Sequence, residues 1–217
     1  MDQYTYRRLD IQLKSILDVG FLTYRGEKMQ RCSWVNQDPL YIDYHDTEWG
    51  KPIHDGQKLF EKICLEGQQA GLSWITVLKK RETYRQCFHH FDPIKVAAMT
   101  PEDIDTLMLN AGLIRHRGKL EAIVNNAKAY LAMQEQGDDF AEFIWSFVDN
   151  KPVINHHSLK TPETFPTSTP ASDAMAKALK KRGFKFVGTT ICYAYMQSMG
   201  LINDHMIECF CHPDNLK

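Results

Sequence analysis

The sequence predicts an all-helical fold, and three observations support this prediction. Apolar residues recur three, four and seven positions apart in several segments, which is the spacing of one buried helical face. One segment opens with a clear helix-start signal, and no segment shows the sustained alternation of apolar and polar residues that marks a strand. With 217 residues, 43% of them apolar and 24% charged, the chain can form one substantial core or two small lobes that share one.

Four segments carry the helical apolar spacing. The first begins after Asp55 and the second continues after Ser73. The apolar positions, in chain order, are Leu59, Phe60, Ile63 and Cys64; Trp74, Val77 and Leu78; Leu120, Ile123, Val124, Ala127 and Leu131; and Phe140, Phe143, Ile144 and Phe147. We expect each set to face the core.

A further helix is marked by its start. Thr100 offers a capping hydroxyl, Pro101 suits the first helical position, and Asp103 can act as the capping-box partner. We expect this helix to begin here and to end near Gly112.

The chain shows one candidate boundary between lobes. Residues 161–172 are rich in Thr, Ser and Pro and cannot form regular helix, so we predict a long loop over about 155–172. It separates two helical lobes of a single domain, residues 29–217. Residues 1–28 carry no motif and precede Met29, so we expect them to be an N-terminal extension.

Charge and hydropathy limit the setting in which the protein works. Its longest apolar runs are far shorter than the roughly 20 residues that cross a bilayer, and its N-terminus lacks an export-signal pattern. We therefore expect a cytoplasmic protein with no membrane partner.

The formal net charge of −1 conceals two local clusters of basic residues. They are Lys177, Lys180, Lys181, Arg182 and Lys185; and Arg115, His116, Arg117 and Lys119.

The six cysteines indicate metal binding or burial rather than a disulfide framework, because cytosolic thiols stay reduced. Cys32 and His45 lie near one end of the chain, and His205 and Cys209 lie four apart near the other. On a helix that spacing places both side chains on one face. Two sulfurs and two imidazoles form a closed tetrahedral set for zinc, which would join the two chain ends. The alternatives are unrelated buried thiols and histidines, or ligation by the neighbouring Cys211 and His212.

Four long motifs and a C-terminal Cys/His pair carry a family resemblance. The motifs are CSWVNQDPLYIDYHDTEWG at 32–50, LEGQQAGLSW at 65–74, AGLIRHRGK at 111–119 and RGFKFVGTT at 182–190. The pair is His205 and Cys209. Together these motifs, in this order over about 29–213, resemble bacterial 3-methyladenine DNA glycosylase I of the helix-hairpin-helix superfamily.

The resemblance implies a fold, a cofactor and a substrate pocket. It implies an all-α helix-hairpin-helix glycosylase with one structural zinc per chain, held by the residues that match here Cys32, His45, His205 and Cys209. The catalytic residues of the base pocket would be Glu66 and Tyr44. The base would also be bound by Tyr41, Trp49 and Trp74. The implied partners are double-stranded DNA containing alkylated adenine and the free 3-methyladenine product, and we expect a monomer associated with the bacterial nucleoid.

These residue types suit the chemistry. An enzyme that acts on a base inside a duplex must extrude it, stack on its faces and read its edge. Adenine methylated at N3 is positively charged, so each well-placed aromatic ring favours it by about 1–2 kcal/mol, and an ionised Glu66 adds attraction. The charge also makes the base a good leaving group. We therefore expect hydrolysis by water in a monofunctional enzyme, without a lysine Schiff base or strand cleavage.

The DNA contacts are expected at a hairpin. Residues 180–190 predict a helix end, a glycine-containing hairpin and a new helix that opens at Thr189, with backbone N–H groups available to phosphate. The candidate contacts are Lys181, Arg182, Gly183, Lys185, Gly188 and Thr189, and residues 115–119 are a second candidate. Asp204 is the only nearby candidate for the catalytic aspartate of other helix-hairpin-helix glycosylases, but its position before His205 favours a helix N-cap.

Three other functions remain to be separated from this one. The first is a glycosylase for mismatched adenine or oxidised guanine, disfavoured because a four-cysteine iron–sulfur spacing is missing. The second is a zinc-containing DNA-binding module without turnover, which would need no base pocket. The third is a thiol enzyme built on Cys64 or Cys192, neither of which lies in a motif with a histidine base.

Overall fold

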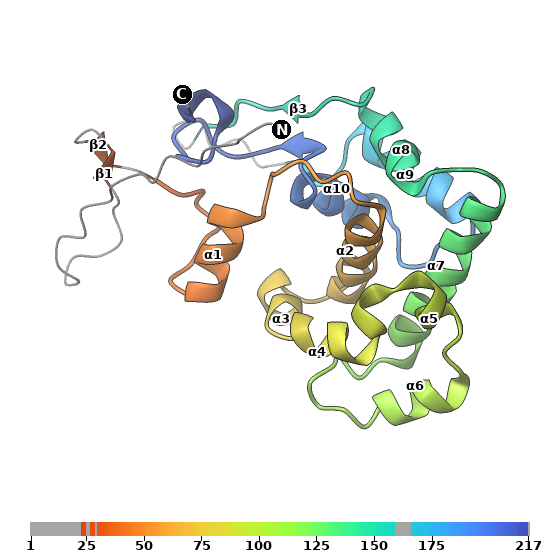
Figure 1. Ribbon diagram of the computed structural model, residues 1–217. Coiled ribbons are helices and arrows are strands. Elements are labelled where there is room, and N and C mark those ends of the chain that lie inside the picture. The colour runs from red at the N-terminus through yellow and green to blue at the C-terminus, as the bar shows by residue number, and fades with distance from the viewer. Residues whose placement is uncertain (1–22, 25–26, 29, 159–165, 217) are drawn as a thin grey trace, which may run out of the picture.

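The computed structural model describes residues 23–24, 27–28, 30–158 and 166–216, and it confirms a mainly helical fold (Figure 1). The α-helices are α1 (Pro39–Thr47), α2 (Gly56–Gln69), α3 (Trp74–Leu78), α4 (Arg81–Cys87), α5 (Pro93–Ala97), α6 (Pro101–Leu107), α7 (Arg117–Glu135), α8 (Phe140–Trp145), α9 (Pro170–Lys181) and α10 (Thr189–Ser198). Short 3₁₀ turns are η1 (His89–Phe91), η2 (Ser146–Val148) and η3 (Pro213–Asn215).

The described residues also form four very short strands that the sequence did not reveal. They are β1 (Thr23–Tyr24), β2 (Glu27–Lys28), β3 (Val153–Ile154) and β4 (Ile202–Asn203). β1 pairs with β2 antiparallel, and β3 pairs with β4 in parallel register. A two-residue strand is too short to show alternation of apolar and polar residues. The prediction of an all-helical chain therefore missed these four strands.

Helix α2 lies at the centre of the molecule, where it contacts α7 on one side and α10 on the other. α5 packs on α7, and α9 packs on α10 (Figure 1). The predicted apolar faces, which lie on α2, α3, α7, α8 and η2, are confirmed. All of their residues are buried, except for three that are partly buried against the core: Leu131, Phe143 and Phe147.

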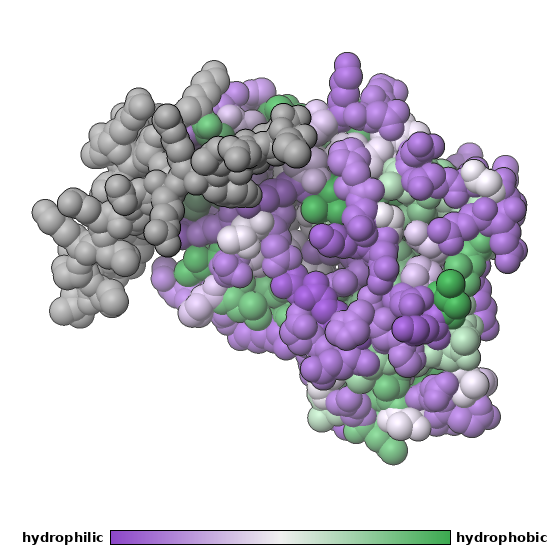
Figure 2. All heavy atoms as spheres, viewed as in Figure 1, coloured by the Kyte–Doolittle hydropathy of each residue, from purple (hydrophilic) through white to green (hydrophobic). Residues whose placement is uncertain are grey.

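The surface seen in Figure 2 is mainly hydrophilic, and its hydrophobic residues are scattered over several elements rather than gathered in one large patch. Along the described parts of the chain, each helix is too short or too polar to cross a bilayer.

Two helix boundaries differ from the prediction. The capping box of Thr100 and Asp103 is present, but α6 ends at Leu107 rather than near Gly112. Residues 161–172 are not all loop, because Thr169 caps α9 and Pro170 occupies its first turn. Proline and serine disfavour a helix interior but suit its start. The predicted loop therefore extended too far, into the first turn of α9. Residues 161–165 lie outside the described residues.

Candidate active site and metal centre

A pocket of about 260 Å³ opens between α1, α2, α3 and α10. Its lining residues are Trp34, Tyr41, Tyr44, Trp49, Glu66, Gln69, Trp74, Ala194 and Gln197. The structure therefore brings together all five residues that were predicted for a base pocket. Four further lining residues were not predicted from the sequence, namely Trp34, Gln69, Ala194 and Gln197. Of these, only the two within the recognised motifs carried a signal that could have pointed to them.

Helix α1 supplies one aromatic wall. Asp38 caps the helix by accepting a hydrogen bond from Leu40 N, and Pro39 occupies the first turn. Tyr41 and Tyr44 are three positions apart and so share a face, with ring centroids 6.4 Å apart in a stacked arrangement. His45, the next residue, points to a different side of α1, toward the Cys/His cluster described below.

The other aromatic rings complete the wall. Trp34 contacts Tyr41 and Trp49, with ring centroids 5.1 and 5.0 Å apart. Tyr44 and Trp74 lie 5.6 Å apart. The indole Nε1 of Trp74 is buried and has no hydrogen-bond partner within the described residues. Buried N–H groups are normally satisfied, so this one suits a site that a ligand completes.

Glu66 lies on α2 and is only 3% exposed, which excludes an ordinary surface carboxylate. Burial raises its pKa, while the cation of Lys62 acts in the opposite direction. Lys62 Nζ lies 3.3 Å from Glu66 Oε1 and donates a hydrogen bond of 2.9 Å to the Tyr44 hydroxyl. Burial also raises the pKa of Tyr44, so its hydroxyl keeps a proton that it can donate.

Lys62 is a buried residue of this site that the sequence analysis missed. Its Nζ lies 3.6 Å from the centroid of the Trp74 ring. Burial lowers the pKa of Lys62 to about 8, although the nearby Glu66 raises it. The i, i+4 spacing of Lys62 and Glu66 was the available signal, since it places both on one helix face.

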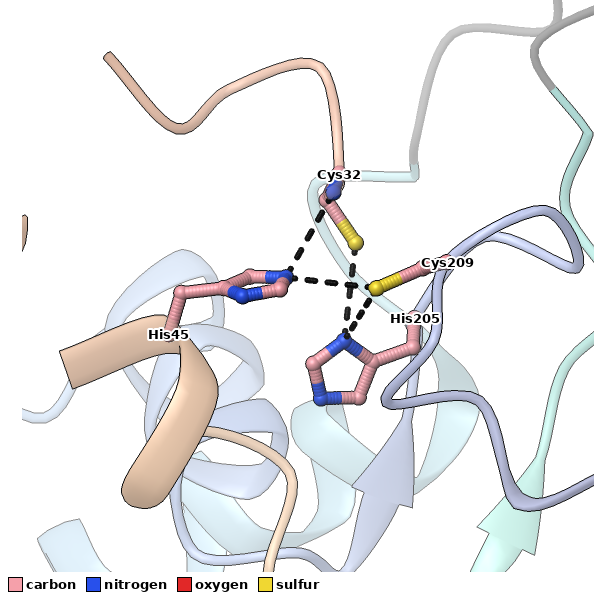
Figure 3. A group of neighbouring side chains, drawn as sticks. All are labelled: Cys32, His45, His205 and Cys209. Carbon is pink, nitrogen blue, oxygen red and sulfur yellow. Dashed lines mark hydrogen bonds between the residues drawn. The ribbon is translucent and has the colours of Figure 1, made fainter. Parts of the chain in front are cut away.

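Two cysteines and two histidines form a buried cluster beside the pocket (Figure 3). Cys32 precedes α1, His45 lies on α1, and His205 and Cys209 follow β4. Their ligand atoms all lie within 4.8 Å of one another. The predicted set is therefore brought together, and it joins segments from opposite ends of the described chain.

The distances in this cluster fit a tetrahedral zinc ion. With Zn–S near 2.3 Å and Zn–N near 2.0 Å, tetrahedral angles place sulfur and nitrogen about 3.5 Å apart. Cys32 Sγ lies 3.5 Å from His205 Nδ1, and Cys209 Sγ lies 3.5 Å from His45 Nε2 and 3.6 Å from His205 Nδ1. Contacts with Cys211 and Cys32 lower the pKa of the Cys209 thiol, whereas contact with Cys209 and burial raise the pKa of the Cys32 thiol.

Further contacts hold these side chains in place. His45 Nδ1 lies 2.7 Å from Asp46 Oδ1, and His205 Nε2 lies 3.0 Å from the Trp49 carbonyl oxygen. Partners of this kind fix the orientation of metal-binding histidines. Gly50 has φ +78°, and an added Cβ would lie 2.9 Å from His205 Nε2, so both the backbone and the space require glycine here.

One detail of the cluster corrects a prediction, and two others concern the alternative ligands Cys211 and His212. His205 and Cys209 lie on an irregular turn rather than a helix, and they converge because Cys209 N bonds to Met206 O. Cys211 lies beside the cluster, and its N–H donates to Cys209 Sγ at 3.4 Å. His212 is placed elsewhere, with a ring nitrogen 3.3 Å from Asn155 O.

Asp204 is not a helix cap, because no helix follows it among residues 204–212. Its carboxylate is fully buried and accepts hydrogen bonds from Asn155, Tyr193 and Gln197 at 2.6, 2.5 and 2.7 Å. It does not line the pocket. Asp204 therefore holds the pocket residue Gln197 rather than facing a substrate.

The hairpin between α9 and α10 has the predicted form, with α9 ending at Lys181 and α10 opening at Thr189. Gly183 has φ +89° at the turn. Asn125 donates to Gly183 O, and Asn126 accepts from Lys185 N, so α7 fixes the shape of the hairpin.

The six hairpin candidates differ in how accessible they are. Lys181, Gly183 and Lys185 are exposed, while Gly188 precedes the first turn of α10. The Thr189 hydroxyl bonds to Asp173 and is engaged within the protein. Arg182 is engaged too, since it pairs with Asp138 and lies 4.3 Å over the Phe143 ring.

The second basic cluster has structural contacts. Lys119 is buried and donates to Gln68 O and Ala70 O at 2.9 and 2.6 Å, where it stabilises the C-terminal end of α2. Arg117 pairs with Asp105 and Glu121. Lys119 is therefore not a phosphate contact.

The thiol-enzyme alternative is also excluded. Cys64 and Cys192 are fully buried. Burial raises the pKa of both thiols, that of Cys192 to about 12, so neither supplies a thiolate near neutral pH.

Comparison with known families decides the family of the chain. A model of the methyladenine glycosylase family matches residues 34–212, a span that contains every pocket-lining residue. The chain belongs to the methyladenine glycosylase family. A relative in this family, DNA-3-methyladenine glycosylase 1 of Escherichia coli K12, is 64% identical over 86% of this chain and 99% of its own length. DNA-3-methyladenine glycosylase of Haemophilus influenzae is 65% identical, with 83% and 97% covered.

Solved structures of the family agree. A crystal structure of 3-methyladenine DNA glycosylase I matches with a TM-score of 0.83 and 67% identity, covering 85% of this chain and 100% of that one. A variant of a 3-methyladenine DNA glycosylase I in complex with 3-methyladenine matches with a TM-score of 0.81 and 39% identity, covering 85% and 98%.

Proposed function

We propose that this protein is a DNA repair enzyme that releases 3-methyladenine from DNA, and that the pocket around Glu66 holds the flipped base. The observation that carries this is a buried carboxylate facing a small pocket walled by aromatic rings. The pocket volume of about 260 Å³ is just below the range of roughly 300–1,000 Å³ typical of small-molecule sites. It suits a ligand no larger than a base. A relative of the same family holds 3-methyladenine itself.

Different pocket residues would recognise different features of the base. The rings of Tyr41, Trp49 and Trp74 stack on the extruded base and attract its positive charge. Glu66 accepts hydrogen bonds from the adenine edge, and the Tyr44 hydroxyl donates one. Recognition therefore rests on charge and fit together, and Glu66 and Tyr44 are the groups that touch the base.

The reaction needs little chemical help from the protein. The N3-methylated base leaves as a neutral molecule when its bond to C1′ breaks, and water supplies the new oxygen at the sugar. We propose a monofunctional enzyme. Lys62 contacts Glu66, Tyr44 and Trp74 of the pocket, but it is 6% exposed and is not among the lining residues, so we do not assign it a Schiff-base role.

We propose zinc as the occupant of the Cys32, His45, His205 and Cys209 cluster. Bound there, zinc supplies a structural cross-link, since four protein ligands leave no open position for a reacting water. The four side chains are buried and match the donor set that zinc prefers.

We propose double-stranded DNA as the partner, bound by a monomer at the α9–α10 hairpin. The exposed Lys181 and Lys185 and the amides at the start of α10 would contact phosphates. Thr189 and Gly188 would contribute main-chain groups only. Because nucleoid DNA is the substrate, we place the enzyme in the bacterial cytoplasm.

The test uses methylated duplex DNA and chromatography of the released bases, with Glu66→Gln as the matched variant. We expect release of 3-methyladenine without strand cleavage. Hydrogen bonds to charged groups contribute about 1.5–3 kcal/mol, so the variant should be roughly 10- to 150-fold slower. DNA binding without release by the zinc-loaded wild-type protein would contradict the proposal and favour a non-catalytic module. Trapping of a covalent adduct with borohydride would contradict the monofunctional reaction.

A further inference from the structure

Lys62 is the least expected group in the site. It is a buried ammonium behind a pocket that we assign to a cationic base. Its Nζ touches three pocket residues at once, with 3.3 Å to Glu66 Oε1, 2.9 Å to the Tyr44 hydroxyl and 3.6 Å to the Trp74 ring centroid. A cation in this place repels a cationic ligand and so weakens its binding. The presence of Lys62 therefore calls for a favourable effect that offsets this repulsion.

We propose that Lys62 is a positioning residue that holds the Glu66 carboxylate ionised and fixes it in the base pocket. This inference rests on the proposed role of Glu66 in binding the base. A buried carboxyl without a partner takes up a proton, and a protonated Glu66 loses its charge attraction for the substrate. Lys62 counters that tendency, because its Nζ lies 3.3 Å from Glu66 Oε1.

The groups around the pair leave Lys62 as its main electrostatic partner. From α1, Tyr41 and Tyr44 stay neutral near neutral pH, because burial raises both pKa values. Glu48 at the end of α1 and Arg81 of α4 form a two-bonded ion pair, at 2.6 and 2.8 Å, so their effects on Lys62 oppose each other.

The remaining neighbours are uncharged. Ser198 of α10 lowers the pKa of Glu66 by a hydrogen bond, and it ranks after burial and Lys62 among the causes. Tyr195 of α10 stays protonated because burial raises its pKa. Trp74 of α3 offers only its ring face to Lys62.

The same contacts predict a reciprocal effect. Glu66 is the main group that raises the pKa of Lys62 against burial. Each residue of the pair therefore supports the charged form of the other, and removal of one must shift the titration of its partner.

The first experiment measures the pH profile of kcat/KM for base release in the wild type, Lys62→Met, Lys62→Arg and the control Lys58→Met. Lys58 is exposed one turn earlier on α2. An opposite charge nearby shifts a carboxyl pKa by about 1–3 units, so Lys62→Met should move the acid limb upward by that amount. Lys62→Arg should restore the limb, and Lys58→Met should leave it unchanged. An unmoved acid limb in folded Lys62→Met would overturn the proposal.

A second experiment needs no activity and so separates this inference from the proposed function. NMR of ¹³C-labelled lysine in the full-length protein should show one lysine titrating near pH 8, well below the ordinary value. That signal should disappear in Lys62→Met and move lower in Glu66→Gln. If the signal is present but Glu66→Gln retains full activity, the role of Glu66 fails and the pairing stands. If the Lys62 signal titrates at the same pH in Glu66→Gln as in the wild type, the pairing itself is wrong.

Discussion

The metal cluster and the base pocket lie side by side, and both are buried and polar, but their polar groups are satisfied in opposite ways. In the cluster, the outer nitrogen of each histidine has a partner, Asp46 for one and the Trp49 carbonyl for the other. In the pocket, Trp74 Nε1 has no partner in the described chain, and burial displaces the pKa values of the Glu66 and Lys62 pair toward their neutral forms. The first arrangement holds chain segments together, while the second suits the ligand that we propose for it.

The largest expected effect comes from breaking the cluster. Cys32→Ser should lose zinc, and loss of a structural metal belongs to the changes that cost more than about 4 kcal/mol. For a chain of this size that lowers Tm by roughly 8–16 °C. Zinc stoichiometry and calorimetry measure both outcomes.

The control for this change is Cys211→Ser. The Cys211 thiol lies next to the cluster but outside the proposed ligand set. It should keep one zinc per chain and a nearly unchanged Tm. If Cys211→Ser loses the metal and Cys32→Ser keeps it, the ligand assignment is wrong.

A smaller effect comes from breaking the pocket. Trp74→Leu removes one aromatic face, and a well-placed ring contributes about 1–2 kcal/mol to the binding of a cation. We expect release of 3-methyladenine to slow by roughly 5- to 30-fold, measured under single-turnover conditions, with zinc content unchanged. Loss of zinc in this variant would show that the two regions are not separable.

The smallest effect concerns neither region but the α9–α10 hairpin, which we propose binds DNA. Lys185→Ala should reduce the slope of log affinity against log salt by about one. Arg182→Ala should leave that slope unchanged and lower Tm, because Arg182 pairs with Asp138 and covers Phe143. Fluorescence titrations of duplex DNA at several salt concentrations measure the slope, and equal slopes for both variants would contradict this division.

The same contrast explains what could be predicted from the sequence. Cys32, His45 and the five predicted pocket residues could be predicted because they lie in long motifs with distinctive residue types. His205 and Cys209 lie outside those motifs and were predicted from their residue types and their spacing of four. Lys62 was missed because a lysine on a helix is normally solvated, and only the tertiary packing of α1 and α3 buries this one. The turn that carries His205 and Cys209 was mistaken for a helix because a spacing of four also occurs in a tight turn closed by the bond from Cys209 N to Met206 O.

Trp49 belongs to both regions, since its indole ring lines the pocket while its carbonyl oxygen accepts a hydrogen bond from His205. A single residue thus connects the proposed metal site to the wall that we propose stacks on the base. Thermodynamic linkage requires that any such coupling act equally in both directions. To whatever extent metal loss weakens base binding through Trp49, a bound base must slow or oppose metal loss by the same free energy. The enzyme would then retain its metal best while it is working on damaged DNA.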